Sequence, residues 1–526
     1  MSSVPVDVEP SGLEARVLDP VVDALGWADT DRDVAAWLRR AYEPDGLFAG
    51  SVLAGTPLPP DAPVHAAEVT VERDSDADAW LRIREAVVFT NPSDATLDRL
   101  QLRVVANGRG HAERSTVVLG CWVDGVAVPT ALDGPLLTIP LPYGLRPGRR
   151  ARVLLHLAEP IPPSDARQQV GTDTLWPDQT GAFAEDDGYL VLGSLLPTVL
   201  SVGRDGRWDT RVLAANADPA VGPPSLFRVT LDAPTSLTPV STGVSLGRIS
   251  DERRATELMV AAGARDFSVV LVPEASVLKT AIGSTRLRVV VSGEAVSGPD
   301  LLRVADDALR SMIRHFGPLT QREIDVVEAP ARAVDGLDWP GLVLVDASHK
   351  GRPYHLSASH EWALAHGLGH QWWGHEVGND GLADPWFDEG LATHAASLYW
   401  EDLHGRDAVL DRHEVEAIEP LAALRDRGFP DLPALLPPDA YDRGSYGLVV
   451  HQRTALFLDL ARQAFGAETW DALLFELHVR GVGRVMGQQD VLDLLRARAP
   501  STFDVDAAWT RWMAEGHAYE DLLGPR

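Results

Sequence analysis

Cysteine is nearly absent from this sequence, and acidic residues far outnumber basic ones. Cys121 is the single cysteine among 526 residues, so no intrachain disulfide can form and a cysteine-based metal site is excluded. Lysine and arginine total 47 against 76 aspartates and glutamates, which gives a formal net charge of −29. Nucleic acids and anionic membranes attract basic surfaces, so this balance argues against both as partners.

Long apolar runs are missing as well. No uninterrupted stretch approaches the length of a membrane-spanning helix. Residues 1–20 carry acids and lack the apolar core that is typical of a secretory signal. We therefore expect a soluble, cytoplasmic protein, and nothing in the composition indicates its oligomeric state.

What is present predicts a multidomain α+β protein. Residues 1–55 contain one amphipathic stretch, 31–43, and are predicted to be a partly helical extension. Short alternating segments separated by turn residues predict an antiparallel β-rich domain over 56–280, in which 172–188 is a long loop. Residues 281–526 mix strands with helices and become mainly helical toward the end. The length is sufficient for two or three domains, each with its own core.

The pentapeptide HGLGH at 366–370 places two histidines four residues apart. A bare pair at this spacing carries little weight, because 16 histidines would produce roughly one such pair by chance in every two chains of this composition. The context adds weight. Residues 359–374 are predicted to be helical behind a serine N-cap at 357 or 359, so both imidazoles can point at one ion. Two glycines inside this helix each cost about 1 kcal/mol relative to alanine, which selection for stability alone would not favour.

A second helix supplies a third ligand. It is predicted to begin at Asp384, with Pro385 in the first helical position. Glu389 lies near its start and offers a carboxylate oxygen. Two histidines and a glutamate with an open fourth position form a catalytic rather than a structural zinc site. His366, His370 and Glu389 are therefore the predicted ligands of one Zn²⁺ ion, although spacing alone leaves open that the two histidines only serve packing.

These motifs resemble the aminopeptidase N family of zinc metallopeptidases, gluzincins that also include the leukotriene-epoxide hydrolases. The resemblance covers roughly residues 60–526 and is to the short bacterial form without a C-terminal helical solenoid. It implies a β-rich domain followed by a thermolysin-like zinc domain, and a peptide or small-molecule substrate. The matching segments, which follow the family's order, are GLDWPGLVLVD (336–346), HGLGHQWWG (366–374), WFDEGLAT (386–393) and AYDRGSYGLVVH (440–451).

The resemblance also implies roles for single residues. Tyr441 would donate a hydrogen bond to the oxyanion that forms at the scissile carbonyl. Asp338 matches the glutamate that binds the free amine of the substrate, with one methylene less, and Gly336 belongs to the same substrate-binding motif. Plain alternatives remain, with Asp338 as a solvated turn acid before Pro340 and Tyr441 as a packing residue.

The second position of the pentapeptide departs from the family pattern H-E-x-x-H. Gly367 stands where the family has the glutamate that takes a proton from water and delivers it to the leaving amine. Positioned proton transfer is typically worth about 10²–10⁴-fold in rate, so peptidase activity is expected to be weakened or lost. No acid near the motif has a spacing that would place it at the water in the position of this glutamate, and the nearby histidines are assigned to the surface or to packing. These acids and histidines are Glu361, Glu376, Asp388, His375 and His394.

Three explanations of Gly367 stay open. The chain could be a pseudoenzyme that binds zinc and peptides without turnover. It could use zinc on an ester, an epoxide or another non-peptide substrate in a biosynthetic pathway. Gly367 could also be a laboratory substitution made to trap a substrate.

Overall fold

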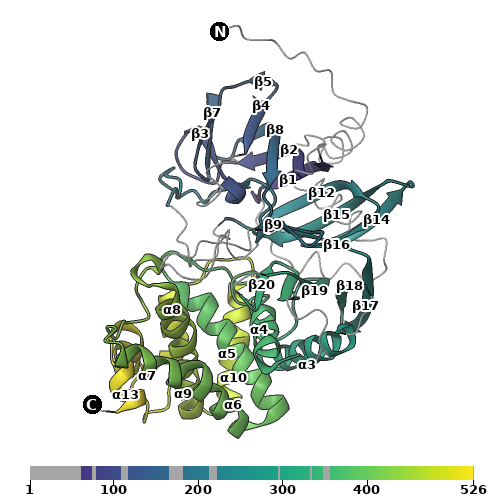
Figure 1. The fold of residues 1–526 in the computed structure, drawn as a ribbon. Coiled ribbons are helices and arrows are strands. Elements are labelled where there is room, and N and C mark those ends of the chain that lie inside the picture. Colours follow the sequence, from purple (N-terminus) through teal and green to yellow (C-terminus); the bar gives the residue numbers. More distant parts are fainter. Residues whose placement is uncertain are drawn as a thin grey trace.

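The computed structural model describes residues 61–73, 79–107, 116–164, 182–211, 222–293, 297–331, 334–347 and 356–524. The α+β fold class is confirmed: strands dominate the first half and helices the second, and Figure 1 shows the strand-rich half above the helical half. The expected helix at 31–43 and residues 172–181 of the expected loop lie outside the described residues. The described end of that loop differs from the prediction, because Phe183–Asp186 pairs with the next strand and forms β9.

Three sheets make up the strand-rich half in the described ranges. The largest has eight strands in the order β14-β15-β12-β1-β2-β8-β4-β5, and two four-stranded sheets have the orders β13-β16-β10-β9 and β11-β3-β7-β6. Side chains along β2 and β8 alternate between buried and more exposed positions, the period-two pattern of a sheet with one face on a core. The strands are β1 (Val64–Arg73), β2 (Ala79–Thr90), β3 (Leu97–Arg103), β4 (Val117–Val123), β5 (Val126–Ala127), β6 (Ala131–Asp133), β7 (Leu136–Leu145), β8 (Arg150–Ile161), β9 (Phe183–Asp186), β10 (Tyr189–Leu192), β11 (Thr198–Val199), β12 (Ser225–Pro234), β13 (Leu237–Ser241), β14 (Val244–Ser250), β15 (Arg254–Ala264) and β16 (Val269–Pro273).

A further sheet of five strands, in the order β17-β18-β19-β21-β20, leads into the helical half. Strands β18, β19 and β21 run parallel, and β17 and β20 pair antiparallel at the two edges. The predicted domain boundary at 280/281 lies within β17. The strands are β17 (Ala275–Ile282), β18 (Thr285–Ser292), β19 (Glu323–Ala329), β20 (Gly336–Trp339) and β21 (Leu342–Asp346).

A buried cluster of strand residues joins the two halves and fixes edge strand β20. It contains Tyr189, Val191 and Val270 from the strand-rich half, and Val327, Trp339 and Leu344 from the five-stranded sheet. Trp339 lies so close to Gly193 that a Cβ there would come within 2.6 Å of the indole. This contact holds β20, and with it the neighbouring Asp338, against the strand-rich half.

The helices cover the other face of this sheet and continue as a bundle. Helix α3 packs on β17 and β18, α4 on β20 and β21, and α5 on α3, α4 and α9. None of the helices in the described ranges is both long and apolar enough to span a membrane. The helices are α3 (Gly298–Phe316), α4 (Ala358–Gly369), α5 (Pro385–His404), α6 (Arg406–His413), α7 (Glu419–Asp426), α8 (Arg443–Tyr446), α9 (Thr454–Phe465), α10 (Ala467–Gly481), α11 (Gln488–Arg498), α12 (Val505–Trp509) and α13 (Ala518–Leu523).

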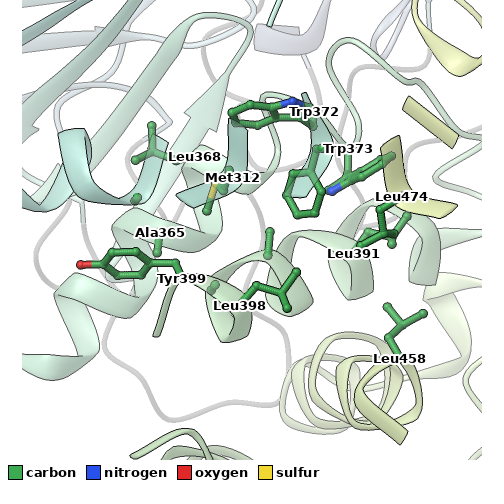
Figure 2. Close-up of a cluster of buried hydrophobic side chains, with 14 of the residues drawn as sticks. Met312, Ala365, Leu368, Trp372, Trp373, Leu391, Leu398, Tyr399, Leu458 and Leu474 are labelled. Carbon is green, nitrogen blue, oxygen red and sulfur yellow. The ribbon is translucent and has the colours of Figure 1, made fainter. Parts of the chain in front are cut away.

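Large apolar side chains fill the space between the helices and hold α4 against α5. Figure 2 shows this core, in which the two tryptophans that follow α4 lie above α5. Both indoles are fully buried, and burial of side chains of this size contributes much of the stability of a core. The labelled members of the core are Met312, Ala365, Leu368, Trp372, Trp373, Leu391, Leu398, Tyr399, Leu458 and Leu474.

Helix α4 ends at Gly369, earlier than the predicted end at Gly374. A few residues further on, the chain turns at Gly374. The Gly374 N–H donates to the Val377 carbonyl at 2.8 Å, and Gly374 adopts φ +112°. Glycine tolerates that conformation, whereas a side chain would strain it. His370 still donates its backbone N–H to the His366 carbonyl at 3.1 Å, so both histidines remain on the last turn of the helix.

Candidate metal centre

Two helix ends bring the predicted zinc ligands together. Ser357 caps α4, since its hydroxyl accepts the backbone N–H of His360, and the helix then places both histidines on one face. The His366 Nε2 and His370 Nε2 atoms lie 3.0 Å apart. Glu389 of α5 places its Oε2 atom 3.2 Å from His370 Nε2 and 3.4 Å from His366 Nε2. Helix α5 begins with Pro385 in the first turn as predicted, but the Asp384 side chain makes no capping hydrogen bond.

The outer nitrogens of both imidazoles are occupied, which leaves the inner nitrogens for a metal. The hydrogen-bond network assigns a proton to His370 Nδ1, which donates to the Trp373 carbonyl at 3.0 Å. His366 Nδ1 donates to the Thr393 hydroxyl at 3.2 Å, and that hydroxyl donates to the Glu389 carbonyl at 2.7 Å. Such outer hydrogen bonds orient metal-binding histidines and fix their tautomer.

The three ligand atoms fit a zinc ion. Ligands about 2.0–2.2 Å from a tetrahedral Zn²⁺ lie roughly 3.3–3.6 Å from one another, close to the separations between these atoms. Two nitrogen lone pairs and a carboxylate converging so closely would repel each other without a cation between them. Burial alone would raise the pKa of Glu389, but the imidazoles around it hold its pKa well below the usual range. A His-His-Glu group able to hold a metal is therefore present.

Gly369 lets α4 and α5 approach closely enough to form this centre. A Cβ at position 369 would lie 3.0 Å from the Ala392 Cα and carbonyl oxygen and 3.0 Å from the Ala395 Cβ. Backbone atoms of α5 cannot move aside without shifting the helix that carries Glu389. The glycine is thus explained by packing, despite its poor helix propensity.

Gly369→Ala should consequently destabilise the protein although alanine favours helices. Overpacking typically costs about 1–3 kcal/mol, more than the gain of about 1 kcal/mol or less from helix propensity, so we expect a net loss of about 1 kcal/mol and weaker zinc binding. Thermal denaturation and competition with a chromogenic chelator measure the two effects. Gly447→Ala is the matched control, since a Cβ at this helical position meets nothing within 4 Å. Equal stability of Gly369→Ala and the wild type would contradict the packing argument.

Asp338 lies beside Gly367. A Cβ built on Gly367 would be 3.5 Å from Asp338 Cβ, 3.8 Å from its Oδ2 atom and 2.9 Å from Val343 Cγ1. The other carboxylate oxygen of Asp338 accepts a hydrogen bond from His375 Nε2 at 3.0 Å. Burial would raise the pKa of Asp338, but the charge of His370 and the contact with His375 together hold it below the usual range. Asp338 is therefore an ionised, partly buried strand residue rather than a solvated turn acid.

Gly336, the other residue of the substrate-binding prediction, begins β20. A Cβ there would lie 2.9 Å from the Leu344 carbonyl oxygen, so the glycine lets β20 approach β21. The predicted contact of Gly336 with substrate stays a prediction.

Tyr441 forms hydrogen bonds with two backbone groups through its hydroxyl. Its hydroxyl donates to the Pro433 carbonyl at 2.6 Å and accepts the Leu436 N–H at 3.2 Å, and burial raises its pKa to about 12. Its ring contacts Tyr446, which contacts His451. The oxyanion role of Tyr441 stays a prediction, which would require the hydroxyl to leave these backbone partners.

His451 is a neighbour of the centre that the sequence did not indicate. Its ring stacks on His366 at 5.5 Å between centroids, and its Nδ1 atom lies 3.4 Å from Glu389 Oε2. Burial lowers the pKa of His451 to about 4, so the imidazole is neutral at pH 7. It comes from a π-helical segment, Gly447–Arg453, whose wider turns are not encoded in the 3.6-residue periodicity used to predict faces.

The remaining acids and histidines near the motif have structural partners. Glu361 accepts the Tyr399 hydroxyl at 2.7 Å, and Glu376 accepts the Thr320 N–H and contacts His478 at 2.9 Å. Both acids are thus engaged in hydrogen bonds with other side chains or with the backbone. Two further side chains are similarly engaged: Asp388 accepts from Asn379 at 2.8 Å, and His394 accepts from Trp470 at 2.9 Å.

Comparison with known proteins shows the fold. No protein-family model matches the sequence, and no curated protein sequence matches it. A mutant two-domain M1 zinc metallopeptidase bound to L-arginine is similar with a TM-score of 0.60 and 19% identity, over 86% of this chain and 93% of that one. A mutant M1 zinc metallopeptidase from Deinococcus radiodurans bound to Tyr-Ser-Ala has a TM-score of 0.58 and 19% identity, over 86% and 94%. The M1 zinc metallopeptidase from the same organism has a TM-score of 0.57 and 19% identity, over 86% and 94%. The chain therefore has the two-domain fold of M1 zinc metallopeptidases, the fold that its motifs predicted.

Proposed function

We propose that this chain is a zinc-dependent hydrolase of the metallo-aminopeptidase type, whose peptidase activity is weaker than that of relatives with a glutamate at the position of Gly367. The observation that carries the proposal is the convergence of His366, His370 and Glu389 with both outer imidazole nitrogens already bonded. A structural zinc site would have four protein ligands. Three ligands next to a partly exposed carboxylate support a reactive site for one ion.

The residues would divide the work as follows. His366, His370 and Glu389 would hold the zinc ion, which when bound supplies a Lewis acid that polarises a carbonyl and makes water more acidic. Thr393 would keep the His366 ring in place through the hydrogen bond to its Nδ1 atom. His451 would close one side of the site with a neutral ring, which keeps water from Glu389. The predicted substrate is a peptide or a small molecule with a carbonyl group, and the predicted location remains cytoplasmic.

A second candidate function is the hydrolysis of a non-peptide substrate, such as an ester. The observation that favours it is Gly367, because an alkoxide leaves without the positioned proton that an amine requires. In that case the amide bond is a poor substrate and an ester of the same amino acid is a good one.

Paired substrates test both candidates. We expect the zinc-loaded wild type to hydrolyse aminoacyl-anilides slowly and the corresponding aminoacyl esters faster, and His370→Ala to abolish both activities. Turnover of both substrates at similar rates would favour the peptidase, and turnover of the ester alone would favour the second candidate. A chain that binds zinc and hydrolyses neither substrate would be the non-catalytic binding protein, and the proposal would be wrong.

A further inference from the structure

The space beside Gly367 is occupied by another carboxylate. In a glutamate at position 367, the side-chain oxygens would lie three bonds beyond Cβ, and Asp338 Oδ2 lies 3.8 Å from that Cβ position. This separation is close to the span from Cβ to the carboxylate oxygens within one glutamate side chain. Asp338 approaches Gly367 from strand β20, whereas a glutamate at position 367 would extend from α4.

Two features hold Asp338 in this position. Trp339 anchors β20 in the cluster between the two halves of the chain. His375, on the turn after α4, is buried and donates its Nε2–H to Asp338 Oδ1 at 3.0 Å. The Oδ2 atom faces Gly367 and has no hydrogen bond to His375. One oxygen is thus fixed by His375, and the other lies beside Gly367.

We propose that Asp338 is the catalytic carboxylate that accepts and returns the proton in the reaction of this site, and that His375 is the residue that positions it. The proposal rests on the hydrolase function proposed above. It differs from the role in amine binding that the sequence motif implies. In this proposal the catalytic carboxylate is carried by Asp338 on β20 instead of by residue 367 on α4.

The proton balance of this step is simple. As the oxygen of a water molecule bonds to the substrate carbonyl carbon, one water proton moves to Asp338 and the carbonyl π electrons move to the carbonyl oxygen. When that electron pair returns, the bond from carbon to the leaving nitrogen or oxygen breaks. The leaving atom takes the proton from Asp338, which is then a carboxylate again. His375 donates to the same carboxylate oxygen throughout.

The proposal also changes the expected specificity. A carboxylate that serves the proton transfer and is bonded to His375 is not available to bind an ammonium group. Substrates with a blocked α-amine should therefore be hydrolysed about as well as those with a free one. An amine-anchoring Asp338 would instead make the free amine essential for binding.

Asp338→Asn separates these roles. The variant keeps the size of the side chain and loses its capacity to accept a proton. We expect kcat to fall about 10²–10⁴-fold for both aminoacyl and N-acetyl-aminoacyl ester or anilide substrates, with KM little changed. Asp335→Asn is the matched control, because Asp335 is exposed three residues upstream and should leave kcat as in the wild type.

Binding measurements complete the test without turnover. Zinc affinity, from chelator competition, and the affinity of the zinc-loaded protein for L-arginine, from calorimetry, should be within a few-fold of the wild type in Asp338→Asn. A raised KM for free-amine substrates only, together with lost L-arginine binding, would assign amine binding to Asp338 and overturn the proposal. An unchanged kcat in an active protein would also overturn it. A wild type without any turnover would overturn the proposed hydrolase function. The catalytic role of Asp338 would then be wrong as well, because it rests on that function.

His375 has its own test. His375→Gln keeps a donor at the place of Nε2 and should retain most of the activity, whereas His375→Ala should lose about ten-fold or more in kcat. Equal losses in the two variants, with equal melting temperatures, would show that His375 does not act by donating to Asp338.

Discussion

Gly367→Glu alone should fail to raise turnover, whereas Gly367→Glu combined with Asp338→Asn should raise it about 10²–10⁴-fold above Asp338→Asn. In the single variant the new side chain meets Val343 Cγ1 at 2.9 Å from its Cβ and brings a second carboxylate to Asp338 Oδ2. Two carboxylates that share a site cannot both ionise easily, and one pKa rises strongly. Removing the charge of Asp338 relieves this repulsion and leaves one carboxylate, now on α4. The kcat of each variant for an aminoacyl-anilide measures the effect.

Gly367→Gln with Asp338→Asn is the control for this prediction. Glutamine has the size of glutamate and meets Val343 in the same way, but it accepts no proton, so the double variant should remain as inactive as Asp338→Asn. If Gly367→Glu alone raised turnover a hundred-fold, the site would be intact except for its glutamate. Asp338 would then not be the proton acceptor, and the natural role of the chain would lie away from peptide hydrolysis.

The convergence of His366, His370 and Glu389 could be predicted from the sequence because its determinants are local. Helical spacing places His366 and His370 on one face, and the start of α5 fixes where Glu389 can reach. The early end of α4 did not disturb this prediction, since His370 still bonds to the last turn. The strand-rich half was equally predictable, because alternation along strands such as β2 reports one buried face.

The relation of Asp338 to Gly367 could not be predicted in the same way. It depends on the packing of β20 against α4, which neither sequence motif encodes. Sequence spacing places Asp338 in one motif and Gly367 in another, so it predicts no contact between them. His375 was assigned to the surface or to packing for the same reason, although it is buried against Asp338. The turn at Gly374, which brings it there, was expected to be helix.

Each chain should bind one zinc ion, and this binding should stabilise the folded protein. His370→Ala should remove both the binding and the stabilisation. A ligand that binds only the folded state at a hundred times its Kd stabilises by about 2.7 kcal/mol. Loss of His370 should lower zinc affinity more than the roughly 10–100-fold that outer hydrogen-bond partners typically cost. Burial would lower the pKa of His370, but Asp338 and Glu389 raise it well above the usual value. Protons therefore compete with zinc, and affinity should increase as pH rises above the usual histidine range toward the raised pKa of His370.

His404→Ala is the matched control for the zinc prediction. His404 lies at the other end of α5 from Glu389 and contacts Glu361 at 3.1 Å, so its loss should leave zinc affinity and the zinc-dependent increase in melting temperature unchanged. Chelator competition and thermal denaturation with and without zinc measure the two quantities for wild type and both variants. Equal zinc affinity of His370→Ala and the wild type would mean that the ion binds elsewhere. The convergence of His366, His370 and Glu389 would then have to be stabilised by a proton shared among them, and the hydrolase proposal would lose its centre.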